Sequence, residues 1–254
     1  MKFRYLSLIS CVFLACFFAV AHSFAQEVTP AQRAQFEGVI KDYLLKNPEI
    51  VRDAMLELDR KEKDAENQAR LKITADKNSL LYTSANAIVV GNPKGDVTLV
   101  EFFDYNCPYC RNSAKDLLQL VKTDKNLGYI LINYAVLSEA SILAAKVALA
   151  FSMQKVELYA SFHQKLFERK GVIGGDHAIY VATNLGADKV RLIKDADSDM
   201  VTKALIASAK LGENLGFVAT PSYIIGNTGV QGYASLVDKK RFVGNMRACE
   251  KAVC

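Results

Sequence analysis

Two cysteines lie between an apolar run and an amphipathic segment, and this arrangement constrains the fold more than any other feature of the chain. Residues 97–103 are rich in β-branched and aromatic side chains, which is the composition of a buried strand. Cys107 then takes the position of a helix N-cap, and Pro108 takes the first helical position, where its missing N–H group is not needed. Apolar residues at helical spacing extend the predicted helix to about Lys122. We therefore expect Cys107 at a strand-to-helix junction.

A thiol at the start of a helix is activated by its surroundings. Free backbone N–H groups and the helix dipole favour the thiolate, and they lower the pKa of such a thiol from about 8.5 into a range of roughly 3.5 to 7.5. Cys110 lies one turn later on the same side, close enough to attack a mixed disulfide formed at Cys107. The pattern predicts dithiol redox chemistry that needs no cofactor. The alternatives are two buried small side chains, a fixed disulfide, or half of a zinc site.

The first residues have the pattern of a secretory signal. Lys2 and Arg4 precede an apolar stretch over residues 6–21, and Ser23-Phe24-Ala25 ends in the small residue that signal peptidase prefers. We predict cleavage after Ala25 and export to the periplasm, an oxidising compartment. The alternatives are an uncleaved membrane anchor and a lipid-modified Cys16.

Length and charge limit the classes of partner. A chain of 254 residues with 51% hydrophobic residues can bury one large core and carry an appendage. The formal net charge of +5 falls to +3 without Lys2 and Arg4. The remaining basic residues are interleaved with acidic ones, so the charge does not indicate nucleic-acid binding.

Removal of the signal leaves four cysteines, of which Cys249 and Cys254 form the second pair. On a continuous helix their spacing places the two α-carbons beyond the reach of a disulfide. A bond between them therefore requires the last helix to end near Cys249 and the tail to fold back. We predict this structural disulfide, with a contribution of about 2 kcal/mol. The alternatives are a free or intermolecular pair and a metal site that unites all four cysteines; we expect no metal.

The segment over residues 26–85 differs from the rest of the chain. Thr29-Pro30-Ala31-Gln32 is a capping box that starts an amphipathic helix, and Asn47-Pro48 separates it from a second helix that becomes highly charged and runs to about Ala75. Two such helices are too small to form a core of their own. Their apolar stripes must pack either on the cysteine-bearing domain or on the same segment of another subunit, and we favour the homo-oligomer.

The cysteine-bearing domain is expected over residues 86–254 and belongs to the α/β class. A strand, helix, strand succession around the cysteines predicts a parallel pair with a right-handed crossover. Only helical signals follow over residues 138–197, which predicts an inserted helical domain. His163 lies among apolar side chains there and is expected to be a packed core residue. The remaining predicted elements are strands over residues 88–90, 128–136 and 222–225 and helices over residues 199–215 and after Leu236.

A second motif, Ala219-Thr220-Pro221-Ser222-Tyr223, precedes the penultimate strand. Together with the CPYC sequence at the start of a helix and the inserted helical block, it resembles the DsbA family of exported thiol:disulfide oxidoreductases, which have a thioredoxin-like fold. The resemblance covers roughly residues 86–253. The N-terminal helical segment resembles the appendage of the ScsC/Com1-like branch, whose members can oligomerise through it.

This resemblance implies roles for several residues. Pro221 would be the cis-proline that faces the disulfide, and Thr220 would offer backbone groups to a bound peptide. Glu101 matches the family's buried acid, which can take the proton of Cys110 when that thiol attacks. The alternative for Glu101 is a strand-edge carboxylate that faces solvent.

Aromatic residues are expected to surround the site. Tyr105, Tyr109 and Tyr223, with Pro108, would offer apolar area to unfolded client proteins. The third predicted strand departs from the pattern of the ScsC/Com1-like branch, because Ile132-Asn133 stands in place of a Lys-Glu pair and Ala135 in place of a proline. That strand therefore offers no lysine for a proton relay.

Family resemblance predicts an oxidase that forms disulfides in exported proteins and is recycled by a DsbB-type membrane partner. The runner-up is an isomerase or reductase of the oligomeric ScsC type, kept reduced by a DsbD-type partner. A hypothesis of another class is a periplasmic protein that uses the cysteines as soft ligands for copper.

Overall fold

The structure, a computed structural model, describes residues 28–254. The predicted signal peptide, its cleavage site and Cys16 lie outside the described residues. The described part of the chain divides into two units, of which the first ends at Arg60 and the second covers Lys61–Cys254. Among the described residues, no helix has both the length and the apolar character that crossing a bilayer demands.

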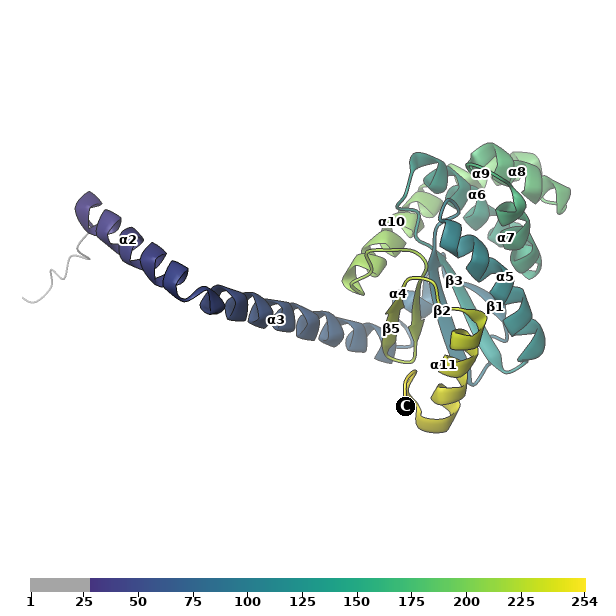
Figure 1. Cartoon of the computed structure of the whole chain (residues 1–254). Helices are drawn as coiled ribbons and strands as arrows, with labels where there is room; N and C mark the ends of the chain where they lie inside the picture. Colours follow the sequence, from purple (N-terminus) through teal and green to yellow (C-terminus); the bar gives the residue numbers. More distant parts are fainter. Residues whose placement is uncertain (1–27) are drawn as a thin grey trace, which may run out of the picture. The chain divides into compact units, whose positions relative to one another are not determined.

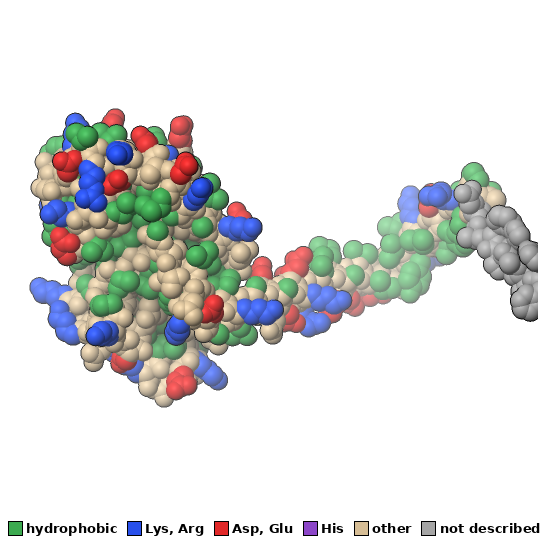
Figure 2. Space-filling model, turned by 180° about the vertical axis from the view of Figure 1, so that it is seen from behind, with side chains coloured by type: hydrophobic (Ala, Val, Ile, Leu, Met, Phe, Trp, Pro, Cys, Tyr) green, Lys and Arg blue, Asp and Glu red, His purple; other side chains and the backbone are tan. Residues whose placement is uncertain are grey.

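The described part of the first unit is helical. Helix α2, Pro30–Lys46, begins at the predicted capping box, in which Thr29 and Gln32 satisfy each other's backbone N–H groups. Helix α3, Pro48–Ala75, follows after Asn47, and its first turns belong to this unit. No residue of α2 is buried, and Figure 2 shows hydrophobic side chains gathered along these helices. This unit therefore presents apolar area that its own residues do not cover.

The second unit is built on a five-stranded mixed sheet in the order β1-β3-β2-β4-β5 (Figure 1). Strand β2 pairs in parallel with β3, and the other three pairings are antiparallel. The crossover between β2 and β3 is the cysteine-bearing helix, which confirms the predicted strand, helix, strand unit. The strands are β1 Ile88–Gly91, β2 Val97–Phe103, β3 Leu127–Asn133, β4 Ser222–Ile225 and β5 Thr228–Gln231.

Helices cover both faces of this sheet and form the predicted insertion between β3 and β4. They are α4 Leu80–Thr83, α5 Pro108–Thr123, α6 Glu139–Lys155, α7 Tyr159–Glu168, α8 Gly175–Asn184, α9 Lys189–Ala196, α10 Asp199–Asn214 and α11 Leu236–Cys249, with a 3₁₀ turn over Val156–Leu158. Alternate residues of β2 enter two separate cores, since Leu99 lies in the core with α5 and α11 and Val100 lies in the core with α4 and α10. This alternation is the two-residue period of a strand covered on both sides.

The boundary between the units differs from the expected one near residue 85. Leu81 on α4 is fully buried in the same core as Val100 and Ile130. With the division after Arg60, this contact places residues 61–85 in the larger unit. The sequence does not reveal this boundary because α4 is a single turn, too short to show an amphipathic period.

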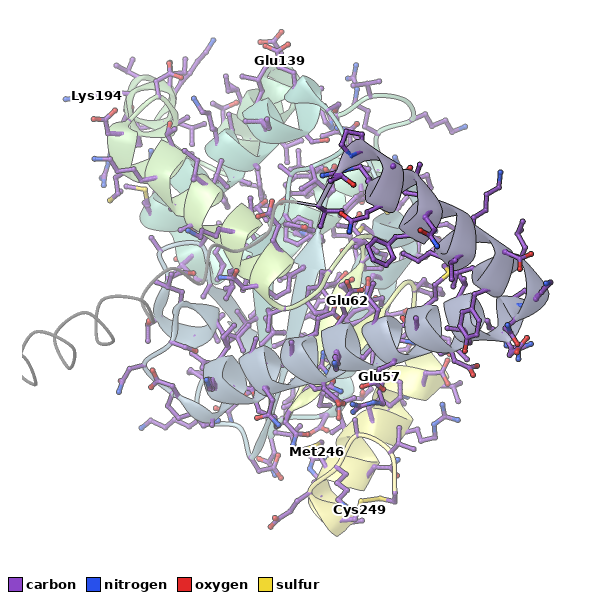
Figure 3. All side chains as sticks on the ribbon, turned by 90° about the vertical axis from the view of Figure 1, so that its left-hand side faces the viewer. Glu57, Glu62, Glu139, Lys194, Met246 and Cys249 are labelled. Carbon is purple, nitrogen blue, oxygen red and sulfur yellow. A yellow bond between two sulfur atoms is a disulfide. The ribbon has the colours of Figure 1, made fainter. Side chains whose placement is uncertain are left out.

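The C-terminal helix ends where the predicted disulfide requires. Helix α11 ends at Cys249, Glu250 adopts a left-handed conformation with φ of 59°, and the tail turns back. Cys249 and Cys254 form a disulfide with their α-carbons 6.3 Å apart, and Figure 3 shows its yellow bond beside Cys249. The left-handed residue stops the helix and reverses the chain, which brings the two sulfurs together.

Candidate active site

The two redox candidates lie where β2 gives way to α5. Cys107 is the N-cap of α5, with an extended backbone (φ −83°, ψ 120°), and Pro108 is the first helical residue. Cys110 lies one turn into the helix and is fully buried. Both cysteines are free thiols in this structure, so it describes the dithiol form.

A buried carboxylate holds the turn before Cys107. Asp104 is 1% exposed, and its Oδ2 accepts hydrogen bonds from the backbone N–H groups of Val136 and Leu137, each at 3.0 Å. Its Oδ1 accepts from the N–H of Asn106 at 2.7 Å. The Asn106 amide in turn donates to the carbonyl of Ile173 at 2.9 Å. The turn is thereby fixed to the helical insertion, a role signalled only by the position of Asp104 directly after a buried strand.

The motif that contains Thr220 and Pro221 contacts Cys107, although Thr220 and Cys107 are 113 residues apart in the sequence. Cys107 Sγ donates a hydrogen bond to the carbonyl oxygen of Thr220 at 3.1 Å. The Thr220–Pro221 peptide bond is cis. Gln231 on β5 supports the approach to this loop, because its side chain donates to the carbonyl of Gly216 and accepts from the N–H of Val218. The structure therefore brings together Cys107, Thr220 and Pro221.

The two thiols differ strongly in acidity. The hydrogen bond from the Cys110 thiol lowers the pKa of Cys107 most, and Thr220 and the backbone N–H groups of Cys110 and Tyr109 lower it further, so the pKa falls from 9.0 to about 6 although the residue is buried. Burial raises the pKa of Cys110 well above 9.0. The expected helix N-terminus effect is present, but the Cys110 thiol is the larger cause. Cys107 can therefore act as the nucleophile while Cys110 stays protonated.

Glu101 is buried, as the resemblance implied, and does not lie at a solvent-facing strand edge. Its side chain on β2 is 1% exposed, and Oε2 accepts a short hydrogen bond from the hydroxyl of Tyr129. Its Oε1 has no hydrogen-bond partner. Burial raises the pKa of Glu101, and its charge in turn raises the pKa of Cys110. A buried acid whose charge acts on the Cys110 thiol is therefore held in a dry environment.

A lysine that the sequence analysis did not single out lies in the same environment. Lys239 on α11 is fully buried, its Nζ donates to Ser113 Oγ at 2.8 Å, and it pairs with Asp116 at 3.2 Å. Ser113 Oγ also lies 3.0 Å from the hydroxyl of Tyr223. The signal was present in the sequence, since Lys239 falls between Leu236 and Val243 on the apolar stripe of the helix.

The β3 residues that differ from the pattern of the ScsC/Com1-like branch place no titratable group near the cysteines. Ile132 is fully buried in the core with α4 and α10. Asn133 is also buried, and its amide donates to Asn86 Oδ1 at 2.7 Å. These positions therefore serve packing and a neutral hydrogen bond.

Two of the tyrosines expected at the rim are core residues. Tyr105 and Tyr223 are each 1% exposed, whereas Tyr109 is 61% exposed and Pro108 is also exposed. Tyr105 packs against His163, a buried histidine whose pKa burial lowers to about 3. The expectation that Tyr105 and Tyr223 offer surface to clients is thus wrong, because both side chains point into the core. His163 has the packed core role that was predicted.

The described residues contain no group of three or more histidine, cysteine, aspartate or glutamate side chains arranged to hold a metal ion.

Comparison with known proteins identifies the family to which this fold belongs. The family model described as thioredoxin matches residues 83–244, which is more than half of the chain. The chain belongs to the thioredoxin family. A second model, the N-terminal domain of the copper resistance protein ScsC, matches residues 32–65.

Solved structures and a curated relative support this assignment. A thioredoxin-like oxidoreductase from Silicibacter pomeroyi DSS-3 is 34% identical and superimposes with a TM-score of 0.61 over 70% of this chain and 96% of its own. ScsC from Proteus mirabilis, in a transitional conformation, is 25% identical with a TM-score of 0.64 over 87% of this chain and 99% of its own. Disulfide bond formation protein D of Bacillus subtilis (strain 168) is 22% identical over 61% of this chain and 74% of its own length.

This thioredoxin-family protein is a DsbA-type, ScsC-like thiol:disulfide oxidoreductase. The thioredoxin-like fold predicted from the sequence is confirmed, and so is the membership of the DsbA family.

Proposed function

We propose that this ScsC-like protein is an oxidase that forms disulfides in exported proteins through Cys107 and Cys110. The observation that carries the proposal is the opposite tuning of the two thiols, a pKa of about 6 at Cys107 beside a strongly raised pKa at Cys110. A stable Cys107 thiolate stabilises the reduced form of the pair, so the disulfide is readily reduced by its clients and is therefore oxidising.

The exchange has two steps. A client thiolate attacks Cys107 of the oxidised pair, which forms a mixed disulfide and breaks the bond to Cys110. Cys110 leaves as a thiolate and takes a proton from the Glu101 carboxyl, the buried acid nearby. A second client thiolate then attacks the client sulfur of the mixed disulfide, so that the client leaves with a disulfide and Cys107 remains as a thiolate.

The client contacts would involve exposed residues and backbone. Pro108 and Tyr109 offer exposed apolar area beside Cys107. Thr220 and the cis Pro221 would face the client peptide, with backbone groups available for strand-like pairing once the Cys107 thiol has reacted.

We place the protein in the periplasm, with residues 1–25 as its cleaved signal and a DsbB-type membrane protein as the oxidant that restores its disulfide. The first unit would mediate homo-oligomerisation. Exposed apolar side chains support this assignment, among them Phe36, Val39, Ile40, Tyr43 and Leu45 at 56–72% exposure. Apolar area of this kind is characteristic of an interaction surface.

The same surface favours a second candidate, an isomerase kept reduced by a DsbD-type partner. Several dithiol sites held in one oligomer can act on one misfolded client in succession. Equilibrium sedimentation of the full chain and of Ile40→Asp tests the oligomer, because a charge at that position must be desolvated to remain in an interface. An unchanged mass for this variant contradicts an interface at that position.

The redox state of Cys107 and Cys110 in cells separates the two functions. Acid quenching followed by alkylation should find the pair oxidised in an oxidase and reduced in an isomerase. Cys107→Ala should abolish disulfide exchange with a reduced multi-cysteine client, while Cys254→Ala, outside the site, should retain it. Exchange that persists in Cys107→Ala refutes both candidates.

A further inference from the structure

A lysine with no access to water requires an explanation. The side chain of Lys239 is 0% exposed, and taking an ammonium group out of water is strongly unfavourable unless fixed partners replace the lost hydration. A methionine or leucine side chain would fill the space of its methylene groups equally well. The charge itself therefore needs an explanation.

The partners of Lys239 compensate its charge only in part. Its salt-bridge partner Asp116 is 14% exposed and also accepts a hydrogen bond from Tyr233 at 2.9 Å. Its other hydrogen bond goes to the neutral hydroxyl of Ser113. The rings of Tyr223 and Tyr233 lie 5.2 and 5.4 Å from the ammonium and offer cation-π contacts. A shared carboxylate and neutral groups leave part of the positive charge acting on the surrounding core.

The second carboxyl group near that charge is Glu101, which is the cross-strand partner of Tyr223, and the Tyr223 ring lies 5.2 Å from the Lys239 ammonium. Lys239 lowers the pKa of Glu101 while burial and Asp116 raise it, burial most strongly. Oε1 of Glu101 has no hydrogen-bond partner and can receive a proton. The groups that act on Glu101 come from every element packed around it: Cys110, Ser113 and Asp116 from α5, Tyr129 from β3, Tyr223 from β4 and Lys239 from α11. Lys239 is the cation of this set.

We infer that Lys239 is a positioning residue for the exchange reaction, which keeps the Glu101 carboxyl able to exchange a proton with Cys110 inside the core. The inference rests on the proposed dithiol function and adds to it a requirement for a charge supplied by α11.

The step concerned is the closure of the active-site disulfide. The Cys110 thiol gives its proton to the Glu101 carboxylate, and the resulting thiolate attacks the sulfur of Cys107 in a mixed disulfide. The Cys107–Cys110 bond forms, the mixed disulfide breaks, and the departing thiolate is protonated by water. The two cysteines are oxidised and the departing disulfide partner is reduced. Lys239 takes no proton, and its charge favours the ionised carboxyl that the step begins with.

Replacement of Lys239 should therefore shift the pH dependence of this closure. In Lys239→Met the carboxyl loses its nearby cation, and we expect the midpoint of the closure rate to rise by about one pH unit or more. The matched control is Lys240→Met, which removes an exposed ammonium from the next position of the same helix. Asp116→Asn removes the opposing negative charge, so it should move the midpoint to lower pH.

The reduced full chain is mixed with oxidised glutathione, quenched in acid at set times and analysed by mass spectrometry between pH 5 and 9. Attack of Cys107 on glutathione disulfide should keep its wild-type rate in all three variants, since Lys239 and Asp116 do not contact Cys107. Of these three variants, only Lys239→Met should accumulate glutathione-bound protein at pH 7, and this species should disappear at higher pH. Glu101→Gln should accumulate it at every pH, because its carboxamide accepts no proton.

The outcomes distinguish the role of Lys239 from the proposed exchange function of Cys107 and Cys110. Midpoints that coincide in Lys239→Met and Lys240→Met, while Glu101→Gln slows closure, overturn the role of Lys239 and leave the proposed function standing. Failure of the wild-type chain to react with glutathione disulfide at Cys107 overturns the proposed function itself. If Lys239→Met does not fold, the direction of the shift in Asp116→Asn decides, and an unchanged or upward midpoint overturns the inference.

Discussion

The acidity of Cys107 can be tested most directly by its rate of alkylation. At pH 5 a thiol with a pKa of about 6 is about 9% ionised, whereas one with the ordinary value of 9.0 is about 0.01% ionised, a difference of about 900-fold in thiolate. A thiolate of lower pKa is a weaker nucleophile, and for a difference of three units in pKa this offsets about 30-fold of the advantage. Cys107 should therefore react about 30-fold faster than a free thiol at pH 5, and only about 3-fold faster at pH 7.

The assay is iodoacetamide labelling of the reduced protein from pH 4 to 9, with mass spectrometry of the peptide that contains Cys107. The labelling rate should rise with a midpoint near pH 6. In Cys110→Ala the midpoint should rise, because the strongest hydrogen bond to the Cys107 sulfur is lost, but it should stay below 9 because the backbone N–H groups remain. Tyr109→Ala keeps the Cys110 thiol and its own backbone N–H, so its midpoint should equal that of the wild type.

A wild-type midpoint near 9 would refute the activation of Cys107. A midpoint that is the same in Cys110→Ala and in the wild type would refute the Cys110 thiol as its main cause and would leave the helix N-terminus as the explanation.

Three further predictions concern stability. Leu81 lies in the core, so Leu81→Ala should lower the free energy of unfolding of the larger unit by about 2–5 kcal/mol in urea denaturation. Leu45 is 72% exposed, so Leu45→Ala should change this free energy by less than about 0.5 kcal/mol. Equal effects of the two substitutions contradict the boundary at residue 60. Arg247 on α11 donates hydrogen bonds to Asp96 at 2.9 Å and to Asp124 at 2.8 Å, and it lowers the pKa of both carboxyls in the folded protein. The two aspartates therefore stabilise the fold above their unfolded pKa of about 3.9 and lose this effect as the pH falls through their lower folded pKa values. Arg247→Met should flatten this acid-side decline in stability, and an unchanged pH profile contradicts the ion pairs. Reduction of the Cys249–Cys254 disulfide should lower the free energy of unfolding by about 2 kcal/mol, beyond any change that the same reductant causes in Cys249→Ala/Cys254→Ala, where only Cys107 and Cys110 can respond.

The sequence predicted the elements around the active site well, because their signals are local. The N-cap position of Cys107, the proline after it and the apolar run before it lie within a dozen residues, and the structure forms a strand and a helix there. The capping box at Thr29 and the helix break at Asn47 are equally local and were also predicted correctly.

Errors arose where burial depends on packing between distant segments. Tyr223 and Tyr109 are both tyrosines next to a motif residue, yet the first lies on the face of β4 that packs beneath α5 and α11 and the second lies on the outside of α5. The short helix α4 was assigned to the N-terminal segment because one helical turn carries no period, although Leu81 fills a core.

The sequence by itself determined that a strand leads into a helix at a pair of cysteines, and that the first of them is positioned for activation, because backbone propensities and caps act over a few residues. Only the tertiary structure decided which groups tune those sulfurs. The Thr220 carbonyl reaches Cys107 from 113 residues away and Lys239 reaches Ser113 from 126 residues away. Such contacts depend on how the sheet and its covering helices pack, and packing is a property of the whole fold rather than of any segment.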